Sequence, residues 1–96
     1  MTALFQTGQI TATPGAMEAM NEEFGDRIAD EVLNLLRQHV TGQWPHDCEE
    51  DQQSNRDAIK YGNRVFTSWI TEGGKKLWII TEADRSLTTI LLPEEY

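Results

Sequence analysis

Hydrophobic positions in the first half of the chain recur at the spacing of amphipathic helices. Between residues 26 and 41 the apolar side chains fall at i, i+4, i+7, i+8 and i+12, which aligns them along one stripe: Ile28, Val32, Leu35, Leu36 and Val40. Arg37 and His39 come late, where the helix dipole favours cations, and Gly42 provides a stop. The pattern predicts the main core helix over about residues 26–41.

A second helix is predicted just before it, over about residues 14–24. Thr13 is a residue type that caps helices, and Pro14 at the first helical position loses no needed hydrogen bond. Three- and four-residue spacing puts further apolar side chains on one face: Met17, Met20 and Phe24. This helix is therefore expected to add a short apolar face to the core.

A third helix is predicted over about residues 47–61, where apolar positions are few. Asp47 and Glu50 have the spacing of a capping box, with Asp in place of the usual Ser or Thr. Because its apolar face is meagre, we expect an edge helix that is mostly solvated or packs against something polar.

The second half of the chain has the composition of strands. β-Branched and aromatic residues fill "VFTSWIT", "LWIIT" and "LTTILL", and the turns "EGGKK" and "EADRS" separate them. This predicts a three-stranded antiparallel meander over about residues 64–92, to which "LFQTGQIT", as a hairpin or bent strand around Thr7-Gly8, could add a strand. We expect one α+β domain over residues 1–96, an antiparallel three- to four-stranded β-meander packed against two to three helices.

Both faces of the predicted sheet carry large apolar side chains, whereas a sheet with one wet face should alternate cleanly. The helices can cover one face, and the other needs a second copy, a partner or the N-terminal segment. Exposed aromatic patches tend to be binding sites. Trp69 and Trp78 are therefore the candidate apolar anchors for a partner.

Charge narrows the range of partners. Sixteen acidic against eight basic residues give a formal net charge of −8, which repels phosphate, and Lys75-Lys76 is the one adjacent basic pair. Direct binding of nucleic acid is not expected. The acidity is explained by solubility, or by an acidic face that mimics DNA or docks on a basic protein. For docking, Glu49, Glu50 and Asp51 form the candidate acidic edge.

Targeting signals are not recognisable in the sequence. The N-terminus lacks the basic start and apolar run of a signal peptide, and no stretch has the length of a membrane span. A single cysteine, Cys48, excludes an internal disulfide and suits a reducing cytoplasm. We expect a soluble cytoplasmic protein that does not contact a membrane.

Two clusters offer an alternative, a small enzyme or a metal-binding protein. His46 and Cys48 could ligate a metal or act as base and nucleophile, but they lack the spacing of a zinc motif and a second pair. Glu82 and Asp84 could bind a cation or act as acid and base, although "TEADRS" also suits a plain turn. Our main expectation is no catalytic residue, no metal and no cofactor.

Three stretches suggest a family: "LFQTGQITATPGA", "CEEDQQSN" and "WIITEADRSLTTILLPEEY". They resemble a group of small bacterial proteins, often called plasmid-related proteins, that occur on plasmids, integrated elements and prophages. This chain departs from them at Trp44-Pro45-His46-Asp47, where the relatives have a Trp-Gly-Asp pattern. The resemblance implies mobile DNA in a bacterium and supplies no catalytic residues.

Small acidic proteins on mobile elements often act against host defences or in element maintenance by binding a host protein. The resemblance and the charge together predict a non-enzymatic accessory protein that binds a host or element-encoded protein. A homodimer is a further expectation, because one small core leaves a thin stability margin.

Overall fold

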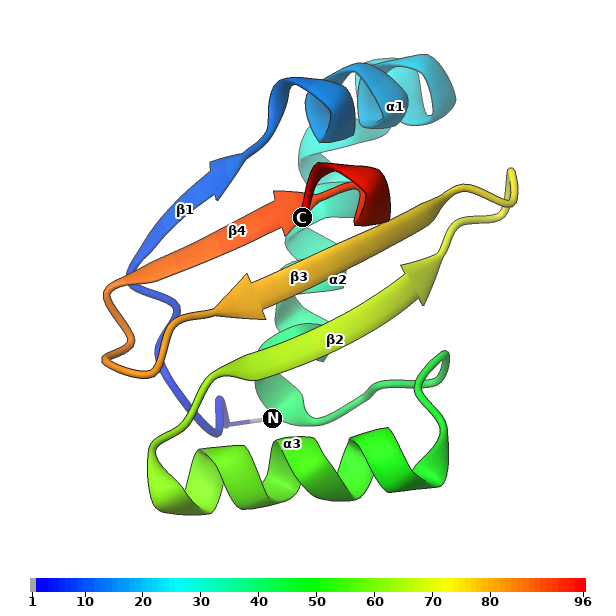
Figure 1. The fold of residues 1–96 in the computed structure, drawn as a ribbon. Coiled ribbons are helices and arrows are strands. Elements are labelled where there is room, and N and C mark those ends of the chain that lie inside the picture. The colour runs from blue at the N-terminus through cyan, green and yellow to red at the C-terminus, as the bar shows by residue number, and fades with distance from the viewer. Residues whose placement is uncertain (1) are drawn as a thin grey trace.

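The structure, a computed structural model, describes residues 2–96 as a mixed sheet with three α-helices and two short 3-10 turns (Figure 1). In chain order the elements are β1 (Gln9–Ala12), α1 (Pro14–Phe24), η1 (Gly25–Arg27), α2 (Ile28–Thr41), α3 (Glu49–Tyr61), β2 (Val65–Ile70), β3 (Lys76–Thr81), β4 (Leu87–Leu91) and η2 (Pro93–Glu95). The predicted α+β class is confirmed. The predicted meander is present as β2, β3 and β4, each antiparallel to the next.

The sheet is mixed, however, and the expectation of a purely antiparallel sheet is wrong. Its strand order is β1-β4-β3-β2, and β1 runs parallel to β4. No hairpin forms at Thr7-Gly8 within the described residues. Gly8 instead has a φ of 64°, and a Cβ there would lie 2.3 Å from the carbonyl carbon of Ser86. Glycine therefore lets the chain pass close to the β3–β4 turn and enter the sheet beside β4.

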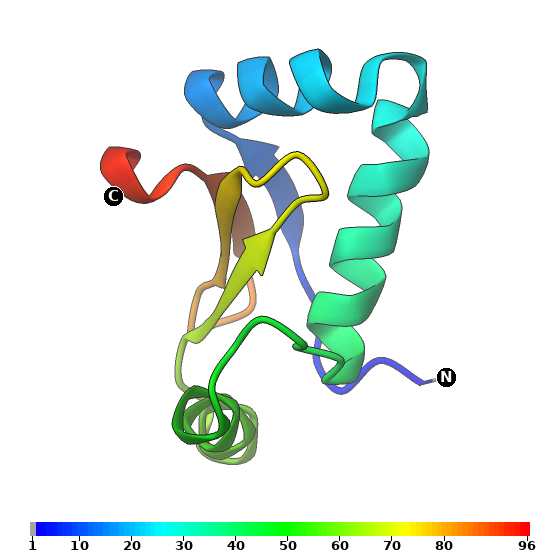
Figure 2. The ribbon, with the colours of Figure 1, turned by 90° about the vertical axis from the view of Figure 1, so that its right-hand side faces the viewer.

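The helices divide between one face and one edge of the sheet. Helices α1 and α2 pack on one face, while α3 runs along the edge formed by β2 (Figures 1 and 2). Thr13 caps α1 as predicted, because its Oγ1 accepts a hydrogen bond from the N–H of Ala16 at 3.2 Å. Apolar residues of α1 and α2 meet the sheet in a buried core that includes Met20, Leu36, Leu77, Ile79 and Ile90.

The centre of this core is polar. His39 of α2 is fully buried, and its Nδ1 and Nε2 lie 2.7 and 2.8 Å from the hydroxyl oxygens of Thr67 on β2 and Thr81 on β3. The hydroxyl of Thr81 meets that of Thr88 on β4 at 2.7 Å, and Thr88 donates to the carbonyl oxygen of Thr7 at 2.8 Å. One imidazole thus ties α2 to three strands and to the N-terminal segment.

The groups at the two ends of this series of hydrogen bonds fix which atom donates at each step. The carbonyl of Thr7 can only accept, so the Thr88 hydroxyl donates its proton to it. Thr88 must then accept from the Thr81 hydroxyl, and Thr81 accepts from Nε2–H of His39. At the other end, the indole N–H of Trp69 donates to Thr67 at 2.7 Å, and the Thr67 hydroxyl donates to Nδ1 at 2.7 Å in preference to the carbonyl of Ile79 at 3.5 Å. Every donor finds an acceptor when His39 is neutral with its proton on Nε2.

His39 is therefore neutral, although it lies late in α2, where the helix dipole favours cations. Burial lowers the pKa of His39 from 6.5 to about 3. A proton on Nδ1 would make the Thr67 hydroxyl accept from both His39 and Trp69, and its own proton would then have only the carbonyl oxygen of Ile79, 3.5 Å away. Desolvation in the core outweighs the favourable position near the end of α2.

Acid should accordingly destabilise the protein through His39. Below pH 6.5 the unfolded chain binds a proton at His39 that the folded protein excludes until the pH approaches about 3. The free energy of unfolding should therefore fall by about 1.4 kcal/mol per pH unit from this residue. Urea titrations between pH 7 and 5, compared for wild type, His39→Gln and the exposed control His46→Gln, measure this slope. Equal slopes in all three proteins would contradict the assignment.

Candidate interaction surface

The sheet face turned away from α1 and α2 carries large aromatic side chains. In the β2–β3 hairpin, Phe66 pairs with Ile80 and Ser68 pairs with Trp78, so these residues share the face opposite the core residues Thr67 and Ile79. Trp78 also pairs with Leu91 on β4. We call this surface the uncovered face, because no α-helix of the described chain packs on it (Figure 2).

Phe66, Trp78 and Tyr96 form what we call the aromatic cluster. The ring centroids of Phe66 and Trp78 are 4.8 Å apart, and the ring of Tyr96 lies 5.7 Å from Trp78 and 6.1 Å from Phe66. Ile80 and Leu91 are buried on the same face, whereas Phe66 and Trp78 are half-buried and Tyr96 is 66% exposed. The cluster thus presents aromatic surface to solvent.

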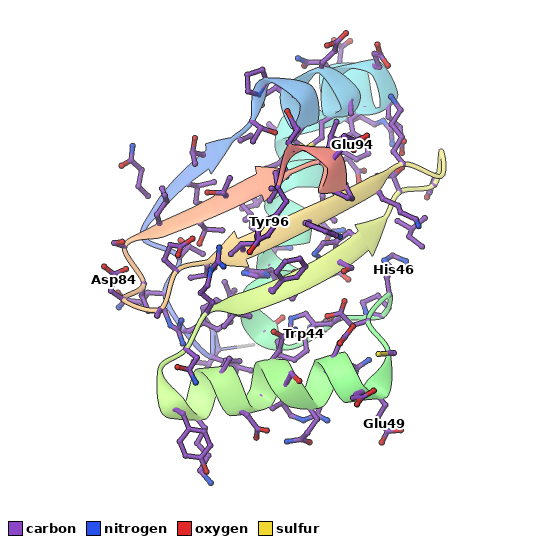
Figure 3. The ribbon with its side chains drawn as sticks, in the orientation of Figure 1. Trp44, His46, Glu49, Asp84, Glu94 and Tyr96 are labelled. Atoms are coloured by element: carbon purple, nitrogen blue, oxygen red, sulfur yellow. The ribbon has the colours of Figure 1, made fainter. Side chains whose placement is uncertain are left out.

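Tyr96 is held in place by the C-terminal turn. The carboxylate of Glu95 accepts hydrogen bonds from the Thr13 hydroxyl, from the Leu92 N–H at 3.0 Å and from the Gly15 N–H at 3.1 Å, which ties η2 to the start of α1. The Thr13 hydrogen bond is the main reason that the pKa of Glu95 is lowered. Arg64 donates to the Tyr96 hydroxyl at 3.0 Å. Figure 3 shows Tyr96 lying over the sheet.

The two predicted tryptophan anchors lie on opposite faces of the sheet. Trp78 belongs to the uncovered face, but Trp69 is 2% exposed and packs in the core beneath the helices. The sequence pattern did not predict Phe66 or Tyr96 as members of the cluster. The place of Phe66 follows from the register of the hairpin. Ile70 pairs with Lys76 across the turn, and the alternation of side chains from that pair puts Phe66 and Trp78 on the same face. Tyr96 reaches the cluster through the long-range contacts of Glu95, which carry no local pattern.

The predicted acidic edge lies elsewhere. Glu49, Glu50 and Asp51 are all exposed and occupy the first turn of α3, where the helix dipole favours acids. Figure 3 shows Glu49 on α3 and Tyr96 over the sheet, so the acidic edge and the aromatic cluster are separate surfaces.

The segment around His46 closes the edge of β2. Three outward N–H groups of this strand donate to side chains: Phe66 to Oδ1 of Asn55 at 3.0 Å, Ser68 to Oδ1 of Asp47 at 2.9 Å and Ile70 to Nδ1 of His46 at 3.2 Å. Asn55 also donates to the carbonyl of Phe66 at 2.8 Å. These side chains occupy the positions that a further strand would use, so this edge is blocked.

The predicted capping box at Asp47 is wrong for this reason. Helix α3 begins at Glu49, and the carboxylate of Asp47 is bound to Ser68 and Asn55. Asp47 is buried, and burial raises its pKa, against the opposing effect of the Ser68 hydrogen bond. Cys48 is an exposed free thiol at the N-cap. His46 thus has a structural contact with Ile70 on β2.

Glu82 and Asp84 are also engaged in the fold. Asp84 accepts hydrogen bonds from the N–H and the hydroxyl of Ser86, at 3.0 and 2.6 Å, as turn residues do. Glu82 forms an ion pair with Arg64 at 3.4 Å. Among the described residues, no three His, Cys, Asp or Glu side chains are grouped as a metal site would require.

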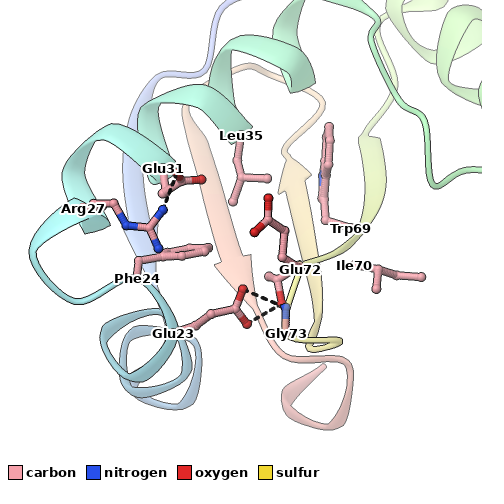
Figure 4. A pocket seen from close by; sticks show the side chains of 10 residues that line it. Glu23, Phe24, Arg27, Glu31, Leu35, Trp69, Ile70, Glu72 and Gly73 are labelled. Carbon is pink, nitrogen blue, oxygen red and sulfur yellow. Dashed lines mark hydrogen bonds and ion pairs between the residues drawn. The ribbon is translucent and has the colours of Figure 1, made fainter.

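A pocket of about 420 Å³ lies between the α1–α2 corner and the β2–β3 turn (Figure 4). Glu23 holds the turn in place, because its carboxylate accepts hydrogen bonds from the Thr71 hydroxyl and the Gly73 N–H. Arg27 and Glu31, which also line the pocket, pair with each other at 3.6 Å. The pocket therefore reflects the docking of the turn on α1.

Comparison of the chain with protein-family models, with curated proteins and with solved structures finds no match. The resemblance to plasmid-related proteins stays a prediction. In the described part of the chain, no helix combines the length and apolar character that a membrane crossing requires.

The edge-closing role of Asp47 can be tested by substitution. Asp47→Ala leaves the Ser68 N–H unpaired under α3 and should destabilise the protein by about 1–3 kcal/mol. Asp47→Asn keeps an acceptor and should cost less. Glu50→Ala, at an exposed position in the first turn of α3, is the matched control. Urea denaturation measures all three, and equal losses in Asp47→Ala and Glu50→Ala would refute the role.

Fluorescence can test which tryptophan faces solvent. Trp44 and Trp69 are 3% and 2% exposed, so Trp78 should supply the emission that acrylamide quenches. Acrylamide is suitable because it is neutral, whereas iodide would be repelled by the acidic surface. Trp78→Phe should abolish most of the quenching and Trp69→Phe should retain it. The reverse result would place Trp69 at the surface.

Proposed function

We propose that this protein is a non-enzymatic accessory protein that binds another protein through the aromatic cluster. The partner is a host protein or one encoded by the same mobile element, in the bacterial cytoplasm. This setting comes from the resemblance to plasmid-related proteins, whose context suits defence evasion or element maintenance.

The aromatic cluster carries this proposal. Tyrosine and tryptophan are enriched at binding hot spots because they bury a large, rigid surface for little loss of conformational entropy. Here Trp78 and Phe66 are half-buried in the free protein, and Tyr96 stands over them with 66% of its surface exposed. A partner would therefore bind to preformed aromatic surface.

The charge of the protein supports a second, electrostatic contribution. Glu49, Glu50 and Asp51 are solvated in the first turn of α3, where no ion pair involves them in the described structure. Exposed charges of this kind change association rates more than affinities. The acidic edge would thus steer a basic partner toward the protein, and the aromatic cluster would hold it.

Site-specific photo-crosslinking in the native bacterium tests the proposal. A benzophenone amino acid in place of Tyr96 should give one discrete adduct with a partner protein. The same probe in place of Tyr61, an α3 tyrosine that is also 66% exposed, should not give that adduct. Equal adducts at both positions, or none at either in a folded protein, would overturn the proposal.

The acidic edge is examined in the same experiment. Changing Glu49, Glu50 and Asp51 together to Ala should slow adduct formation at low ionic strength and have less effect in high salt. A loss of the adduct that is independent of salt would assign those residues a direct contact instead.

A further inference from the structure

The β2 edge and the β1 edge of the sheet differ in whether their outward backbone groups have hydrogen-bond partners. At the β2 edge, side chains from α3 and the loop before it satisfy three outward N–H groups. At the other edge, β1 pairs with β4, and in the described chain no strand lies beyond it. One edge of the sheet is thus closed and the other is open (Figure 1).

The hydrogen bonds of β1 show which groups the open edge offers. The N–H groups of Gln9 and Thr13 donate to the carbonyls of Ser86 and Ile90, so the odd-numbered residues face β4. Ile10 and Ala12 therefore turn both their N–H and their C=O groups outward. Ile10 and Ala12, on either side of Thr11, together offer four outward backbone groups, and such groups form a template for another strand.

An apolar groove of about 320 Å³ runs beside these groups on the helix side of the sheet. Ile10 and Met17 line it at 47% and 41% exposure, and Ile28, Ala29 and Val32 of α2 form its wall. A strand added to β1 would direct alternate side chains over this groove. Backbone pairing and apolar burial thus favour the same kind of occupant.

Charge decides which strand fits best. Residues 1–17 contain no Asp, Glu, Lys or Arg, although a quarter of the whole chain is charged. The groove residues of α2 named above are uncharged as well. Each copy of the protein carries −8, so the repulsion between two copies is smallest where they meet through an uncharged surface. A basic partner would instead be drawn to the acidic helices.

We propose that the protein forms a two-fold dimer by antiparallel pairing of β1 with β1 of a second copy. The register that uses all the outward groups places Ile10 opposite Ala12 of the second copy, with four backbone hydrogen bonds. Thr11 then lies on the two-fold axis, opposite Thr11 of the second copy. The two sheets join into one, and the groove of each copy is covered. This surface is separate from the aromatic cluster, so dimerisation does not depend on partner binding.

Sedimentation velocity across a dilution series tests the dimer. Wild type should sediment at twice the monomer mass, and Ile10→Lys should be monomeric because it places a charge in the groove. Ile70→Lys is the matched control, since Ile70 is 48% exposed against 47% for Ile10 and lies on β2. It should remain dimeric. A monomeric wild type overturns the proposal, and so does dissociation by Ile70→Lys with retention by Ile10→Lys.

A disulfide tests the register without disturbing the groove. In a Cys48→Ser background, Thr11→Cys should oxidise to a covalent dimer, because residues opposite each other in a non-hydrogen-bonded antiparallel pair have Cα atoms about 4.5 Å apart. Gln9→Cys should not, since Gln9 would face Thr13 of the second copy. Cross-linking of both variants at equal rates, or of neither, refutes this pairing.

Discussion

The neutral imidazole of His39 is the contact on which the rest of the structure depends. It links α2 to Thr67 and Thr81, and through Thr88 to the N-terminal segment, in one directed chain of hydrogen bonds. A chain of this kind is sensitive to protonation, because a proton on Nδ1 removes the acceptor that the Thr67 hydroxyl uses at 2.7 Å and leaves it only the Ile79 carbonyl at 3.5 Å. Sheet, helix layer and N-terminus are thus held in register by a group that must remain uncharged.

Helices α1 and α2 cover one face of the sheet, and the other face and the two edges differ in chemical character. The β2 edge is sealed by His46, Asp47 and Asn55. The uncovered face is occupied partly by the turn that Glu95 anchors, and the β1 edge keeps its backbone groups free. Polar side chains that resemble catalytic residues in the sequence are used to block an edge or build a turn. Apolar and aromatic groups stay at the surface, where they suit association.

Separate surfaces also allow separate roles. The aromatic cluster lies on a sheet face, the acidic edge on α3 and the uncharged β1 at the opposite border of the sheet (Figures 1 and 3). In a two-fold dimer built through β1, both copies of the aromatic cluster would remain accessible. Such an arrangement would present two identical sites to a partner, and paired weak contacts gain effective concentration.

Local patterns in the sequence determined α1, α2 and the β2–β3–β4 meander, because caps, three- and four-residue spacing and turn residues act between near neighbours. The acidic turn of α3 could likewise be recognised as a surface feature, whereas the sequence did not distinguish Trp78 from Trp69. Only the tertiary structure decided that Trp69 is core, that β1 is parallel to β4 and that Asp47 serves β2 and not α3. The contact of Asp47 with Ser68 spans 21 residues and that of Thr88 with Thr7 spans 81. Hydrogen bonds over such separations form only once the chain has folded, so no local pattern announces them.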